Sequence, residues 1–405
     1  MNTPTESAAL RFAQGPRMNA LTLVQEQPRE TGARLEIDLG AIAANTQLFA
    51  RRSSADVMAV VKADGFGHGA VDVARTALAN GASSLGVTGI EEGVRLREAG
   101  LRAPVLSWLN PVDADVESAI RQGIDLAVPS RPHLEAVITQ AAAMRMTAQI
   151  HLHLDTGMAR DGSEPSAWPG LCRAARLAER SGTVQVVGVM GHLGCADHPS
   201  DPCNATGRTR FAWGVEAARS AGLRPAIRHL AATSATLTDP RTHHDVCRVG
   251  AGLVGIDPSR TVALRPAMTL TAPFVSVRRV RAGTNVGYAH TWTARAVTHL
   301  GLLPLGYADG LPRAASGRAE VLVRGRRRPI VGRISMDQVV VALGDNRVEP
   351  GEIATVFGPG DAGEPTVADW ASWADTIEHE IVTGIGSRVH RHTRAAHAGA
   401  LRSLS

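Results

Sequence analysis

The sequence is poor in several residue types, and each scarcity narrows what the protein can be. Lys62 is the only lysine in 405 residues, so 42 of the 43 basic side chains are arginine. There are two tyrosines, Tyr288 and Tyr307, and four cysteines, none in a CxxC pair. This spacing argues against a disulfide framework and against a metal site, and it favours a reducing compartment, the cytoplasm. Because no run of 18 apolar residues occurs, the sequence predicts no membrane span.

The charge distribution does not indicate a nucleic-acid partner. The formal net charge is +5 and the pI is about 9.5, but the arginines are scattered apart from one run, RGRRRP, at 324–329. Without interleaved aromatic residues, that run predicts a solvated turn between strands. Residues 1–33 lack the apolar core of a signal peptide, and we predict that they form a mobile N-terminal extension.

Short apolar runs alternate with helical segments over residues 34–267. Eight such runs are strand candidates: 57–61, 84–87, 104–109, 125–128, 149–154, 186–193, 226–231 and 246–252. This rhythm predicts an α/β fold, an N-terminal (β/α)8 barrel. A doubly wound sheet is the alternative, but the first strand candidate is not followed by the GxGxxG turn that such sheets usually carry.

Residues 268–405 have a different composition and residue pattern. Their strand-like segments are rich in β-branched residues and are separated by glycine and proline turns. One helix is expected after Thr366, with Asp369 three positions later in a capping-box arrangement. The sequence therefore predicts a second, mainly β domain over 268–405.

The single lysine directly follows the first strand candidate, where barrel enzymes carry their chemistry. Arginine would serve as well for positive charge or for phosphate binding. Only an amine can lose a proton, attack an aldehyde and form a Schiff base. We therefore predict imine chemistry at Lys62. Four more polar residues follow or lie in later strand candidates: Arg160, His192, His229 and Arg248.

Six segments in order along the chain resemble the alanine racemase family: VVKADGFGHG, LDTGMARDG, VCRVGAGLVG, VGYAHTW, LGYADG and VGRISMDQ. The resemblance runs from about residue 34 to 393. It implies a barrel followed by a β domain, pyridoxal 5'-phosphate as cofactor, and a cytoplasmic homodimer with shared active sites. It also implies interconversion of L- and D-alanine, which would supply D-alanine for peptidoglycan.

The resemblance also implies roles for individual residues. Lys62 would hold the cofactor, and it would share acid/base catalysis with Tyr288, which the partner subunit supplies. Arg160 and the backbone of Met336 would bind the substrate carboxylate, and Arg160 would also contact the cofactor. Arg248 would face the pyridine nitrogen, where a group with no proton to spare favours racemisation over transamination. Further cofactor contacts would be His192, His229, Thr233, Gly250, Ala251 and His379, and the substrate corridor would contain Asp197, Tyr307, Arg313, Arg333 and Asp337.

Four positions depart from the family pattern. Phe66 and His379 stand where the family has phosphate-binding tyrosines, and His153 stands where many members have a carbamylated lysine. Ala232 replaces an asparagine. Two alternatives therefore stay open: a racemase-fold paralogue acting on another amino acid in secondary metabolism, and a weakly active protein that binds pyridoxal phosphate.

Overall fold

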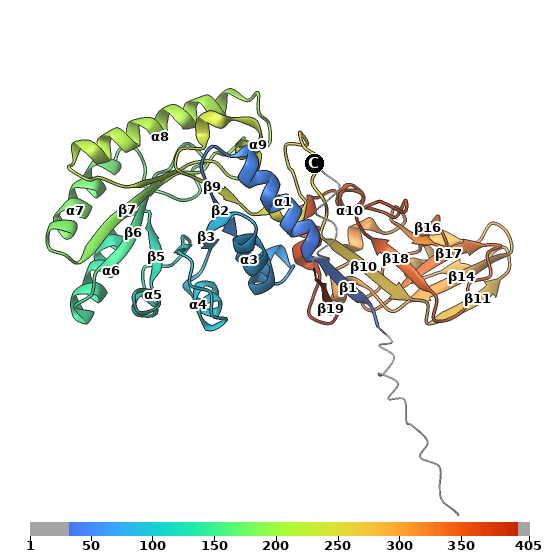
Figure 1. The fold of residues 1–405 in the computed structure, drawn as a ribbon. Helices are drawn as coiled ribbons and strands as arrows, with labels where there is room; N and C mark the ends of the chain where they lie inside the picture. Colours follow the sequence, from blue (N-terminus) through green and yellow to red (C-terminus); the bar gives the residue numbers. More distant parts are fainter. Residues whose placement is uncertain (1–31, 396–405) are drawn as a thin grey trace, which may run out of the picture. The chain divides into compact units, whose positions relative to one another are not determined.

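The first sheet is a nearly closed barrel of parallel strands (Figure 1), seen in a computed structural model that describes residues 32–395. Within that range, eight strands pair in the order β8-β7-β6-β5-β4-β3-β2-β9. They are β2 (Asp56–Val60), β3 (Ala82–Val87), β4 (Val105–Ser107), β5 (Ile124–Val128), β6 (Ala148–His153), β7 (Val184–Met190), β8 (Ile227–His229) and β9 (Val246–Val249). All eight predicted strands are confirmed. The predicted extension, 1–33, lies outside the described residues except for its last two.

Helices follow the strands and cover the outside of the barrel (Figure 1). They are α1 (Leu39–Arg52), α2 (Lys62–Phe66), α3 (Ala70–Ala79), α4 (Ile90–Glu98), α5 (Val116–Gln122), α6 (Arg131–Met144), α7 (Trp168–Arg180), α8 (Pro202–Ser220) and α9 (Thr233–Thr238), with the 3-10 turns η1 (Pro240–Thr242) and η2 (Ala251–Val254). Most of the strands between them are buried on both faces, which explains their continuous apolar sequences. No helix within 32–395 is long and apolar enough to cross a membrane.

The barrel closes between β8 and β9 without a regular ladder. The backbone N–H of Arg248 donates to the carbonyl of Ala231 at 3.0 Å, and that of Asp245 donates to the carbonyl of Arg228 at 3.0 Å. The Asp245 carboxylate also accepts two hydrogen bonds from the Arg228 guanidinium, at 2.7 and 2.8 Å. These contacts bring the ends of the eight strands into one ring, so the side chains that follow them converge.

The second sheet has nine strands within the described range, in the order β11-β14-β17-β16-β15-β18-β10-β1-β19. They are β1 (Arg34–Asp38), β10 (Met268–Pro273), β11 (Ser276–Val280), β14 (Thr298–Leu303), β15 (Glu320–Val323), β16 (Arg326–Val331), β17 (Val339–Gly344), β18 (Ile353–Phe357) and β19 (His390–Arg394). The smaller elements are β12 (Asn285–Val286), β13 (Trp292–Thr293), η3 (Tyr288–His290), η4 (Tyr307–Asp309), η5 (Arg313–Ala315), α10 (Val367–Ala374) and α11 (Glu378–Gly384). The mainly β character of this half is thus confirmed, as is the capping box of Thr366 and Asp369.

One strand of the second sheet comes from the start of the chain. β1 pairs antiparallel with β10 and parallel with β19, so the first strand of the described residues belongs to the second sheet, and α1 follows it into the barrel. Asp38 marks this transition, because its carboxylate caps α1 by accepting from the N–H groups of Gly40 and Ala41. The same carboxylate pairs with Arg394 of β19 at 2.5 Å.

Candidate active site

Lys62 opens an unusual turn at the carboxyl end of β2. Residues 63–67 all have left-handed backbone, with φ between +51° and +78°, although three of them are not glycine. This conformation costs roughly 1–2 kcal/mol for each L-residue that has a Cβ. Such strain persists only where the surroundings hold the backbone in place, and it is concentrated at functional sites.

Contacts from four elements, α3, α4, α11 and β19, hold the turn. The Glu92 carboxylate of α4 accepts the N–H of Ala63 at 2.7 Å. The Asp64 carboxylate accepts the N–H of Ala70 at 2.9 Å and pairs with Arg391 of β19 at 2.6 Å. Gly67 lies so close to α11 that a Cβ there would sit 2.4 Å from the carbonyl oxygen of Val382. The Lys62 turn is therefore fixed by the barrel and by the second domain together.

The surroundings of Lys62 make its amine easier to deprotonate. Burial lowers the pKa of Lys62 because the charged form loses hydration. The nearby guanidinium groups of Arg160 and Arg248 lower it further, while the carboxylate of Glu92 acts in the opposite direction. More of the amine is consequently neutral near physiological pH, which is the form that acts as a nucleophile or a base.

Arg248 is completely enclosed and makes five contacts. Its guanidinium donates to the carbonyl of His229 at 2.8 Å, of Gly191 at 2.7 Å and of Leu230 at 3.2 Å. It also reaches the Nδ1 atoms of His229 at 3.0 Å and of His192 at 3.3 Å. Burial lowers the pKa of Arg248 to about 10, so the group stays a cation at neutral pH.

A line of hydrogen bonds continues from Arg248 through the barrel interior. Because the guanidinium donates to Nδ1 of His229, the ring proton of His229 is on Nε2, which lies 2.9 Å from Nδ1 of His151. Nε2 of His151 lies 3.4 Å from the Asp125 carboxylate. Burial, with the charge of Arg248, holds the pKa of His229 well below its usual value. His229 contacts the guanidinium directly, and His151 contacts His229 from behind.

Arg160 lies in the loop after β6 and lines a small hollow of about 20 Å³ with His192, His153 and Asp161. Burial lowers the pKa of His192 to about 3, and the charges of Arg248 and Arg160 add to the effect. The buried ring of His153 has its Nδ1 3.4 Å from the Asp161 carboxylate. The His153 imidazole and the Asp161 carboxylate therefore lie close together at the loop that carries Arg160.

A second group of polar atoms surrounds the ring of Phe66. Oγ1 of Thr233 accepts from the N–H groups of Gly250 and Gly252 at 3.4 and 3.2 Å. Gly250 must lack a side chain, because a Cβ there would lie 2.7 Å from the Phe66 ring. On another side, the His379 ring is 6.0 Å from Phe66 between centroids, and its buried Nδ1 has no hydrogen-bond partner among residues 32–395.

Tyr288 belongs to a different hollow, of about 480 Å³, on the second domain. Arg333, Ser335 and Arg278 line it too, and the Tyr288 side chain is 67% exposed. Within residues 32–395, no hydrogen bond or ion pair joins Tyr288 to Lys62. Lys62 is not among the residues that line this hollow.

The predicted corridor residues and Met336 lie partly in the second domain and partly, as Asp197 does, in a barrel loop. Tyr307 and Met336 are exposed and adjacent, because the N–H of Tyr307 donates to Ser335 at 3.0 Å and that of Ala308 donates to Met336 at 2.9 Å. The Asp337 carboxylate pairs with Arg388 at 2.7 Å. Three further residues are exposed: Arg313 in η5, Arg333 beside Tyr288, and Asp197 in the loop between β7 and α8.

Two family models match nearly the whole described chain: the alanine racemase N-terminal domain matches residues 37–258, and the C-terminal domain matches residues 267–393. The chain belongs to the alanine racemase family. An alanine racemase of Thermobifida fusca is 47% identical over 363 residues, 89% of this chain and 97% of that protein. One of Mycolicibacterium smegmatis is 46% identical over 365 residues, 89% of this chain and 94% of that protein.

Solved structures of alanine racemases have the same fold. The enzyme of Streptomyces lavendulae superposes with a TM-score of 0.89 at 43% identity, covering 90% of this chain and 97% of that one. The alanine racemase of Bartonella henselae, which has covalently bound pyridoxal phosphate, gives a TM-score of 0.81 at 25% identity, covering 90% and 99%. Pyridoxal phosphate is thus the cofactor to test against the residues of this member.

The residues of this racemase-family chain fit pyridoxal phosphate. Lys62 offers a half-buried amine of lowered pKa for the aldehyde. The phosphate needs hydrogen-bond donors, and the N–H groups of Thr233, Ser234 and Ala251 are buried without an acceptor within the described chain. His379 adds a buried ring nitrogen without a partner. Unpaired buried donors are rare in proteins, and together they form a cradle for an anion.

Three residues in this region were not among the predicted site residues. Glu92 holds the Lys62 turn, and nothing local in the sequence marks it. His151 and Asp125 extend the hydrogen bonds behind Arg248. His151 carried a usable signal, because it stands two positions before His153 in a strand and therefore shares its face of the barrel.

Proposed function

We propose that this protein is a pyridoxal-phosphate-dependent alanine racemase that acts as a cytoplasmic homodimer. The observation that carries the proposal is Lys62: the only amine among 43 basic side chains stands at the carboxyl end of a barrel strand, half-buried near two guanidinium groups. The family supports the reaction and the cofactor. The four cysteines are free thiols, which supports a reducing compartment.

Racemisation requires one proton to leave Cα on one face and another to arrive on the opposite face. We assign these roles to Lys62 and Tyr288. Since Tyr288 is exposed and lines a hollow that does not include Lys62, it would serve the site of a second copy of the chain. The hollow beside Tyr288, with Arg333 in its wall, would then receive the partner's barrel and form part of the substrate corridor.

When bound, pyridoxal phosphate supplies an aldehyde for amines and a conjugated ring that withdraws electrons from the substrate. Thr233, Gly250, Ala251 and His379 would hold its phosphate. Arg248 would face the pyridine nitrogen and could donate a hydrogen bond but not a proton, because guanidinium remains charged. Weak electron withdrawal follows, which favours returning the proton to the same carbon.

The substrate carboxylate would be bound by Arg160 and by the backbone N–H of the partner's Met336. A racemase for a different amino acid is the second candidate, because His153 with Asp161 replaces the usual support of Arg160 and Phe66 replaces a phosphate-binding hydroxyl. D-alanine for peptidoglycan is the product expected under the first candidate.

A racemisation screen of the proteinogenic amino acids, with excess pyridoxal phosphate, tests the proposal. Alanine is expected to be converted fastest from both enantiomers. If another amino acid is converted faster, that amino acid and not alanine is the substrate. If none is converted, the protein binds the cofactor without acting as a racemase. Lys62→Ala should abolish conversion and the visible absorption that the lysine-bound cofactor produces. If that absorption persists unchanged, Lys62 is not the residue that holds the cofactor.

A further inference from the structure

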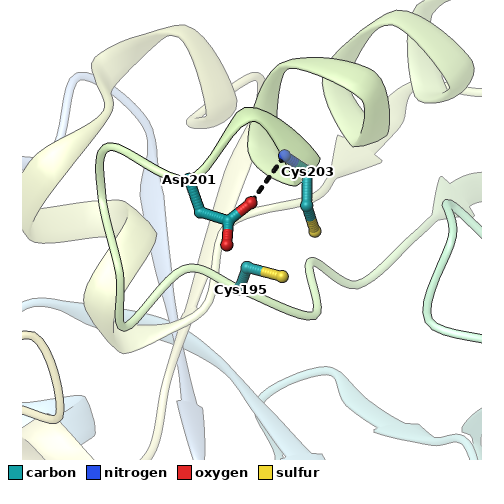
Figure 2. Close-up of side chains that lie close together, drawn as sticks. All are labelled: Cys195, Asp201 and Cys203. Atoms are coloured by element: carbon teal, nitrogen blue, oxygen red, sulfur yellow. Dashed lines mark hydrogen bonds between the residues drawn. The ribbon is translucent and has the colours of Figure 1, made fainter.

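The loop between β7 and α8 brings three potential metal ligands together, away from the residues used above. The Sγ atoms of Cys195 and Cys203 and a carboxylate oxygen of Asp201 all lie within 4.8 Å of one another (Figure 2). All three residues are half-buried. Seven residues separate the two cysteines, so they do not form a CxxC pair, and the sequence pattern did not indicate a site.

The loop that carries these side chains is held in shape by its own hydrogen bonds. The buried Asn204 donates from Nδ2 to the carbonyls of Cys195 at 3.1 Å and His198 at 3.0 Å. The N–H of His198 donates to Cys195 at 3.0 Å, and that of Asp201 donates to His198 at 3.0 Å. The three ligands are therefore positioned by the fold and do not need to be gathered by an ion.

Asp201 has one oxygen to spare. Its Oδ1 caps α8 by accepting the N–H of Cys203 at 2.8 Å, and Figure 2 shows its other oxygen outside that bond. The cap also fixes the carboxylate next to the two thiols. A carboxylate can keep its capping bond and coordinate a cation with the second oxygen.

The donor set points to a particular class of cation. Two thiolates and one carboxylate suit zinc and related soft or borderline ions, whereas magnesium and calcium select oxygen ligands. The ligand atoms of a tetrahedral zinc ion are separated by roughly 3.3–3.8 Å, so the present separations need only small side-chain rotations. We propose that Cys195, Asp201 and Cys203 bind a divalent cation of the zinc type, with water as the fourth ligand.

Such an ion would clamp the loop to the first turn of α8. The loop begins just after Met190 and contains His192, which contacts Arg248, and Asp197, a predicted corridor residue. Binding to the folded state alone would also raise the unfolding temperature as the ion concentration rises. The site is independent of the proposed racemase chemistry, since none of its three ligands is assigned to that reaction.

Cobalt(II) is the probe, because cobalt–thiolate coordination gives absorption bands that zinc lacks. The full-length protein, loaded with pyridoxal phosphate and kept reduced with a phosphine, is titrated with Co²⁺. One equivalent per chain is expected to produce a thiolate-to-cobalt band in the near ultraviolet. Zn²⁺ should then displace the cobalt, remove the band and raise the unfolding temperature.

Four variants decide whether the cluster is the site. Cys195→Ser and Cys203→Ser should each abolish the band. Asp201→Asn retains a side chain that caps helices well, so the fold is preserved while the affinity falls at least about tenfold. Cys172→Ala, which removes a thiol buried in α7, is the matched control and should bind like the wild type.

Three results would overturn the proposal. One is no band at millimolar Co²⁺ with the reduced wild-type protein. Another is a band that survives in both serine variants, which would place the ion elsewhere. The last is a Cys195–Cys203 disulfide in the purified protein with no cobalt bound after reduction, because the pair would then be a redox couple only.

Discussion

Activity should return when two inactive chains are combined. In one chain Lys62→Ala removes the amine, and in the other Tyr288→Phe removes the hydroxyl. In a two-fold symmetric dimer with shared sites, each site takes its lysine from one chain and its tyrosine from the other. The mixed dimer therefore has one site with both native residues and one site with neither.

The size of the effect follows from counting sites. Random pairing of the two chains gives half mixed dimers, each with one native site of two, so about a quarter of wild-type activity is expected. Mixed dimers isolated with two different affinity tags should reach about half. Each variant alone should be close to inactive from at least one enantiomer, because one face of Cα has lost its acid/base group.

The assay is the rate of alanine racemisation by co-expressed, doubly tagged dimers loaded with cofactor. A reciprocal pairing serves as control: wild type with a Lys62→Ala, Tyr288→Phe double variant should be nearly inactive, because neither site then holds both groups. If the lysine and tyrosine acted within one chain, this pairing would keep half of the activity and the first pairing would have none. That reversed pattern would refute the shared site.

Three further predictions concern single residues. His379→Phe removes the buried ring nitrogen that has no partner, and it should weaken pyridoxal phosphate binding about 10- to 100-fold, since a hydrogen bond to a charged group contributes roughly 1.5–3 kcal/mol. Phe66→Tyr adds a hydroxyl and should tighten the binding. Cofactor titration of the apoprotein checks both variants, and affinities equal to that of the wild type would contradict the predictions. Asp161→Asn removes the carboxylate 3.4 Å from His153 and should raise KM for alanine more than it lowers cofactor affinity, and an unchanged KM would count against it. Burial lowers the pKa of His68 to about 4, so as the pH falls below about 6.5 this histidine is protonated in the unfolded chain before it is protonated in the folded one. The free energy of unfolding, measured with urea, should therefore fall by on the order of 1 kcal/mol per pH unit down to about pH 4. A free energy that stays unchanged over that range would contradict the prediction.

The barrel was predictable because its signal is local. Most of the parallel strands are buried on both faces, so they are short apolar runs bounded by turns; β8, with two half-buried residues of three, is the exception. β1 was not predicted as a strand of the second sheet, although its side chains alternate between exposed and buried. Its partners, β10 and β19, lie more than 200 residues further along the chain, and no local pattern encodes a pairing over that distance.

The chemistry of the site could be read from residue identity, because only an amine forms an imine and the chain has one lysine. The arrangement around it came from tertiary packing. Folding sets Glu92 against the Lys62 turn, aligns His151 behind Arg248, and leaves Tyr288 exposed in a hollow that Lys62 does not line. Folding also brings Cys195 beside Cys203. These contacts join residues that are distant or irregularly spaced in sequence, and periodicity reports only on neighbours within one strand or helix.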